Sequence, residues 1–143
     1  MGKTNWMRVF WGGILAGVVM NILVIAASAI YLGELWRSAL QALNPAFHES
    51  TGFWTSWIVF YLILGILAVW LYSAIRPRYG AGAKTAVFAG LGVWILCPLS
   101  YNVLSAIFGL FPANLLVIDA FTFLVVSIVG TLLGAWVYKE KSR

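Results

Sequence analysis

Charge, histidine and cysteine are all scarce in this chain. Only 9% of its 143 residues are charged, and it has one cysteine and one histidine. The lone cysteine, Cys97, forms no intrachain disulfide. The lone histidine, His48, excludes a haem held by two axial histidines of the same chain. So little charge in a chain that is 63% hydrophobic excludes a soluble domain of this size.

Long charge-free stretches fill most of the chain instead. They cover residues 9–33, 50–75, 85–118 and 120–138. About 20 apolar residues cross a bilayer as a helix, so each stretch is long enough for one span. We therefore expect an all-α fold, a four-helix transmembrane bundle with a short interfacial helix on the outer side. The predicted single domain covers 1–143, with spans at about 6–32, 53–75, 83–108 and 114–138.

The first span has some features of a cleaved signal. Lys3 and Arg8 precede the apolar run, and Ala27-Ser28-Ala29 resembles a cleavage site. The apolar run is longer than that of a typical signal peptide. We therefore expect residues 1–32 to remain as a signal-anchor helix.

Basic residues fall almost entirely on one side of the four predicted spans. That side holds Lys3, Arg8, Arg76, Arg78, Lys84, Lys139, Lys141 and Arg143. The other side holds only Arg37. Because lysine and arginine concentrate on the cytoplasmic face, the pattern predicts that both termini are cytoplasmic. For a bacterial protein the membrane is then the inner one.

The longest connection, between the first two spans, has helical periodicity. Apolar residues recur between Leu35 and Leu43 while Glu34 and Arg37 take the other face, which predicts an interfacial helix at about 34–43. Two prolines set further expectations. The second span should end at Arg76-Pro77, and Pro98 should kink the third.

Small and amide residues predict helix packing. Gly13 and Gly17, like Gly130 and Gly134, lie four residues apart, a spacing that lets helices approach closely. Asn21 and Asn102 are expected to form hydrogen bonds between helices, because a polar amide in hydrocarbon needs a partner. Two aromatic residues, Tyr61 and Trp94, fall outside the predicted interfacial belts and should face a neighbouring helix or a bound molecule.

The connection between the second and third spans offers a weak binding motif. Gly80-Ala-Gly-Ala-Lys-Thr85 lacks the glycine directly before lysine that a phosphate-binding loop needs, and a span precedes it in place of a strand. The three basic residues Arg76, Arg78 and Lys84 suit contact with anionic lipid headgroups, although topology alone also explains them.

Two further polar residues have open roles. Asp119 falls about 28 Å from Tyr138 along a helix, at the outer edge of the apolar core, and this favours an interfacial carboxylate over an ion site. His48 lies beside Glu49 with no nucleophile nearby, so a solvated loop histidine is expected, and a single axial ligand to a metal or pigment stays open. The cofactor-binding residues and the cofactor are therefore unknown.

One segment carries a family resemblance. Residues 70–86, WLYSAIRPRYGAGAKTA, resemble a segment that recurs in small bacterial four-span membrane proteins of uncharacterised function. The Asn21-bearing first span and Trp136-Val-Tyr138 fit the same pattern. The resemblance implies architecture and a bacterial origin, and it implies no activity.

The sequence favours a non-catalytic accessory or structural subunit of a larger membrane complex, such as a respiratory or photosynthetic one. Predicted partners are lipids and membrane subunits, or further copies of the chain, and not nucleic acid. No acid–base pair and no charged residue is expected deep in a span, whereas ion pathways usually need such groups. The alternative is a small oligomeric transporter or channel. An enzyme is not expected.

Overall fold

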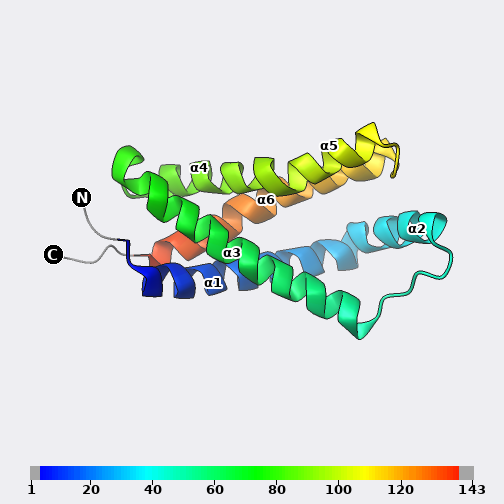
Figure 1. Ribbon diagram of the computed structural model, residues 1–143, viewed down its shortest axis with the longest axis horizontal. Coiled ribbons are helices and arrows are strands. Elements are labelled where there is room, and N and C mark those ends of the chain that lie inside the picture. Colours follow the sequence, from blue (N-terminus) through cyan, green and yellow to red (C-terminus); the bar gives the residue numbers. More distant parts are fainter. Residues whose placement is uncertain (1–3, 139–143) are drawn as a thin grey trace.

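The protein forms a helical bundle in a computed structural model that describes residues 4–138 (Figure 1). Its elements are α1 (Trp6–Ala27), η1 (Ser28–Leu32), α2 (Gly33–Leu43), α3 (Thr51–Tyr79), α4 (Ala83–Trp94), η2 (Ile95–Leu99), α5 (Ser100–Ile107) and α6 (Ala113–Val137). Four continuous helical stretches are long and apolar enough to cross a membrane. No strand occurs within these residues, so the predicted all-α four-helix bundle is confirmed.

The helices run alternately up and down. Helix α1 packs against α3 and α6, α4 packs against the same two helices, and α3 meets α6 across the centre. The amide of Asn5 donates to the hydroxyl of Tyr138 over 3.4 Å, which joins the first and last described segments. The Tyr72 hydroxyl accepts from the amide of Gly82, so the α3–α4 turn lies beside them. We call the end of the bundle that holds Asn5, Tyr138 and the α3–α4 turn the N/C end, and the opposite end, which holds α2, the α2 end.

The first span and the predicted outer helix form one continuous stretch. The π-helical turn η1 joins α1 to α2, and α2 continues in nearly the same direction (Figure 1). Gly33 permits this turn, because a Cβ there would lie 2.5 Å from the carbonyl oxygen of Ser28. The stretch of 38 residues is about 57 Å long at 1.5 Å per residue. It exceeds an apolar core of about 30 Å, so α2 extends beyond the span.

The two helical prolines have different effects. Helix α3 continues through Pro77 to Tyr79, which corrects the predicted end near residue 75. The missing N–H of Pro77 removes only one bond near the end, and Gly80, with φ of 85°, then ends the helix. Pro98 lies inside the π-helical turn η2, where the hydroxyl of Ser100 donates to the carbonyl of Ile95 over 2.7 Å.

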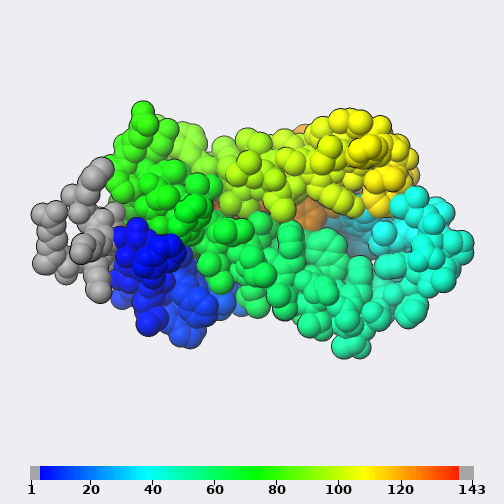
Figure 2. Space-filling view, viewed as in Figure 1, coloured from blue at the N-terminus to red at the C-terminus, as the bar shows by residue number. Residues whose placement is uncertain are grey.

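Packing is tight toward the N/C end and looser toward the α2 end. Seven residues of α3 between Tyr61 and Ser73 are buried, whereas none of residues 51–60 is. Helix α3 crosses the bundle obliquely (Figure 1), and in the space-filling view its first half lies along one edge while α5 lies along the other (Figure 2). Within residues 4–138, residues 51–60 of α3 are therefore the part of that helix that the bundle covers least.

Candidate functional site

A carboxylate is enclosed between three helices near the α2 end. Asp119, on α6, is 3% exposed. Its Oδ1 accepts a hydrogen bond from the indole Nε1 of Trp36 on α2, and its Oδ2 accepts one from Nδ2 of Asn102 on α5, each over 2.8 Å. Asn102 is itself 4% exposed, and its Oδ1 is buried without a hydrogen-bond partner. The site joins one acid, one amide and one indole from three separate elements.

Aromatic packing holds Trp36 over this carboxylate. Its ring meets Phe111 edge to face, with centroids 4.9 Å apart, and lies 6.4 Å from the ring of Tyr101. A second bond ties the same region together, since the hydroxyls of Tyr31 and Thr122 lie 2.9 Å apart. The stretch from η1 to α2 is thus fastened to α6 at two points.

A hollow of about 320 Å³ lies between α2 and the start of α6. It is lined on α2 by Leu35, Ser38, Ala39, Ala42 and Leu43, and on the other side by Leu110, Pro112, Asn114 and Leu115. Water needs only about 10–15 Å³ of such space. Leu115 lies four residues before Asp119, about 6 Å along the helix axis, so the hollow lies beside the turn that precedes the carboxylate.

Sequence reasoning located Asp119 correctly along the helix but missed its surroundings. The sequence placed Asp119 at the outer edge of the apolar core, and the structure adds that Trp36 on α2 contacts it there and that its side chain is buried. Trp36 on α2 donates into the site. The one available signal was that Asn102 and Asp119 are polar residues at similar depth in consecutive spans.

Asn21 also bonds to another helix. Its Nδ2 donates to the carbonyl of Gly17 on its own helix over 2.9 Å and to that of Ile58 on α3 over 3.3 Å. The bond lies where α3 begins to leave the bundle. No ligand needs to be invoked to account for this amide.

The predicted glycines lie at close helix contacts. A Cβ at Gly13 would lie 2.5 Å from Cα of Ile66, and one at Gly17 would lie 2.6 Å from Cα of Leu62, both on α3. Toward α6, a Cβ at Gly130 would lie 2.6 Å from Cγ of Met20. A Cβ at Gly134 would lie 2.6 Å from the carbonyl oxygen of Gly12. These contacts place α1 directly against the backbones of α3 and α6.

The three basic residues at the N/C end differ in exposure. The guanidinium carbon of Arg76 lies 5.4 Å from the ring centroid of Tyr138, whereas Arg78 and Lys84 are exposed. The hydroxyl of Thr85 donates to the carbonyl of Gly80 over 2.7 Å. Thr85 therefore closes the turn. Arg78 and Lys84 are the exposed basic side chains beside it and are available to lipid headgroups.

His48 and the two unusual aromatic residues have local roles. Nδ1 of His48 lies 3.2 Å from the carbonyl of Ala46, and the side chain is exposed. Tyr61 stacks on Phe123 of α6, and Nε1 of Trp94 donates to the carbonyl of Ala120 over 2.8 Å. Within residues 4–138, no group of three or more histidine, cysteine or acidic residues could hold a metal ion.

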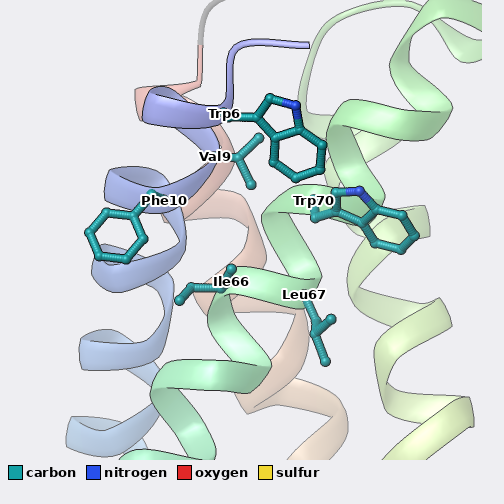
Figure 3. Close-up of a pocket in the computed structure, with 6 residues that line it drawn as sticks. All are labelled: Trp6, Val9, Phe10, Ile66, Leu67 and Trp70. Carbon is teal, nitrogen blue, oxygen red and sulfur yellow. The ribbon is translucent and has the colours of Figure 1, made fainter.

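An apolar groove of about 490 Å³ lies between α1 and α3 near the N/C end (Figure 3). It is lined by Trp6, Val9, Phe10, Ile66, Leu67 and Trp70. Apart from two indole N–H groups the lining is hydrocarbon, so it offers no group for acid–base or nucleophilic chemistry. The groove suits an apolar chain such as those of the surrounding lipid.

In comparisons with known proteins, no protein-family model, curated protein or solved structure matches this chain. The resemblance of residues 70–86 to small bacterial membrane proteins stays a prediction.

Proposed function

We propose that this four-helix membrane protein is a non-catalytic accessory or structural subunit of a larger membrane complex. The observation that carries the proposal is the poorly covered start of α3, residues 51–60. Residues 51–60 bury none of their side chains, and Trp54, Trp57 and Phe60 are 41%, 42% and 39% exposed. Aromatic residues are enriched where proteins meet, so this segment suits a helix of another subunit.

The packing of the rest of the bundle supports a subunit over a self-sufficient transporter. Between the middle and the N/C end, α1 meets α3 and α6 backbone to backbone at its glycines. Met20, Ala16 and Ala68 are completely buried there. Such packing leaves no room for a solute to pass through a single chain.

The enclosed Asp119 favours a second candidate, a small oligomeric transporter or channel. Ionisable residues within membrane spans commonly mark ion or proton pathways. Because one chain is closed toward the N/C end, the pathway would have to run between copies, with residues 51–60 of α3 at their interface. The two candidates therefore make different predictions about what covers the same segment.

Cross-linking from α3 in the native membrane discriminates between them. A photoreactive amino acid at Val59, 47% exposed on α3, should join the chain to a different membrane protein that co-purifies in fixed stoichiometry. The same group at Leu96, 75% exposed on η2, is the matched control and should join lipid. Cross-links between copies of the chain would contradict the subunit proposal.

Flux measurements add an independent test. Purified alone and reconstituted into liposomes, the chain should move no ion or solute, at a level indistinguishable from empty liposomes. Saturable flux would replace the subunit proposal with the oligomeric transporter.

The proposed location is the bacterial inner membrane, with both termini in the cytoplasm and with lipid headgroups as further partners of Arg78 and Lys84. The support is that Arg8, Arg76, Arg78 and Lys84 all belong to the N/C end. Lys3 and the basic residues after Tyr138 lie outside the described residues. Basic loops of this kind are retained on the cytoplasmic side.

Reporter fusions test this orientation. A reporter that is active only in the periplasm should give no signal after Arg143 and a strong signal when the chain is truncated after Ala46, in the α2–α3 connection. The reverse pattern would show that the N/C end faces outward.

A further inference from the structure

The Asp119 carboxylate has only neutral partners. Its two hydrogen bonds come from an indole and an amide. Within the described part of the chain, the ion pairs are those of Arg37 with Glu34 and with Glu49, on the outside of the α2 end. An ionised carboxylate that is buried without a cation is costly in an apolar interior. Within the described residues, therefore, no positive charge pairs with the Asp119 carboxylate.

Asn102 is suited to a carboxyl group that gains and loses a proton. An amide presents a donor on one side and an acceptor on the other, and a rotation exchanges them. Its Nδ2 donates a hydrogen bond to the ionised carboxylate, while its buried Oδ1 has no hydrogen-bond partner. Because nothing holds Oδ1, turning the amide breaks only the bond to Asp119. The turned amide would accept a hydrogen bond from a protonated carboxyl.

Trp36 links the same carboxylate to α2. An indole is a donor only, so it bonds most strongly to the ionised form, where the bond is charge-assisted. Neutralising Asp119 therefore weakens one of the two points that fasten α2 and η1 to α6, leaving the bond between Tyr31 and Thr122.

We infer that Asp119 is a proton-binding site that is shared with Asn102 and coupled through Trp36 to the seating of α2 on α6. A hydronium ion on the side of the hollow beside Leu115 gives its proton to Oδ2: one O–H bond of the hydronium breaks, one forms at Oδ2, water remains, and the charge of the carboxyl group changes from −1 to zero. The Asn102 amide turns to accept from that O–H. The site stands independently of a subunit or a transporter role.

The titratable neighbours define the controls. Tyr61 on α3 and Tyr101 on α5 interact electrostatically with Asp119, and Cys97 on η2 interacts with Tyr61. Phenols and thiols ionise in the alkaline range. On α2, Glu34 and Arg37 pair with each other at the surface. Exposed His48, in the connection that follows α2, is the histidine to remove as a control.

Indole NMR tests the site in the full-length chain in lipid nanodiscs. With ¹⁵N-labelled tryptophan, the Trp36 N–H resonance, assigned by its loss in Trp36→Phe, should titrate in one step within the pH range over which the chain stays folded. The Trp94 resonance is the internal control, because its acceptor is the backbone carbonyl of Ala120 and does not titrate. The step should persist in His48→Gln and vanish in Asp119→Asn.

Three results would overturn the inference. A Trp36 resonance that is constant over this range in the wild-type chain would exclude proton binding at Asp119. A step that survives in Asp119→Asn would assign the proton to another group. A midpoint that depends on sodium, with choline as the comparison, would make the ligand a metal cation. Should Asp119→Asn fail to fold, Asn102→Leu should move the midpoint, because it removes a hydrogen bond to the carboxyl group, and an unmoved midpoint would contradict the shared site.

Discussion

Replacing Gly65 with isoleucine should prevent α1 from packing against α3. A Cβ at Gly65 would lie 2.5 Å from the carbonyl oxygen of Gly13 and 2.7 Å from Cα of Gly17, and it would also meet the amide nitrogen of Gly17. These are backbone atoms of another helix, so no side-chain rotation relieves the clash. The two helices would have to separate, and the contacts of Gly13 and Gly17 with α3 would be lost with them.

The expected cost is at the upper end of the about 1–3 kcal/mol that overpacking a well-packed interior produces, or beyond it. Thermal unfolding in mild detergent measures it. Gly52→Ile on the same helix is the matched control, because a Cβ there meets only Oγ of Ser50 at 3.7 Å. Equal unfolding temperatures for the two variants would show that α1 and α3 do not meet at Gly65.

Replacing Asp119 with leucine should release α2 from the bundle. The change removes the acceptor of both half-buried Trp36 and buried Asn102, and a buried donor left without a partner costs about 1–3 kcal/mol. The donor on α2 can escape this cost by moving away from α6. Faster proteolysis within 33–50, together with a lower unfolding temperature, is the expected result.

A double-mutant cycle separates the hydrogen bond from a general packing defect. In a Trp36→Phe background the indole donor is already absent, so Asp119→Leu should cost less there than in the wild-type chain. Asp119→Asn keeps one acceptor oxygen and should be milder in both backgrounds. Strictly additive effects of Trp36→Phe and Asp119→Leu would mean that the bond does not hold α2.

The elements themselves were predictable, because their signals are local. The length of the apolar stretches predicted the four spans. Helical periodicity predicted the outer helix at 34–43, close to the observed Gly33–Leu43. Pro98 marked the position of the irregular turn η2. Local signals were less reliable at the end of α3. Pro77 disfavours a helix, but the loss of one bond two residues before Gly80 does not stop it.

Sequence alone determined that the chain is an α-helical membrane protein with glycine pairs spaced for close packing, because composition and periodicity act within one helix. Tertiary structure decided which surfaces meet. Gly65 received no packing role from the sequence, yet it lies against the backbone of α1. Likewise, Trp36, Asn102 and Asp119 are separated by up to 83 residues and become one site only when three helices converge. Burial of the carboxylate follows from that convergence, which no local pattern encodes.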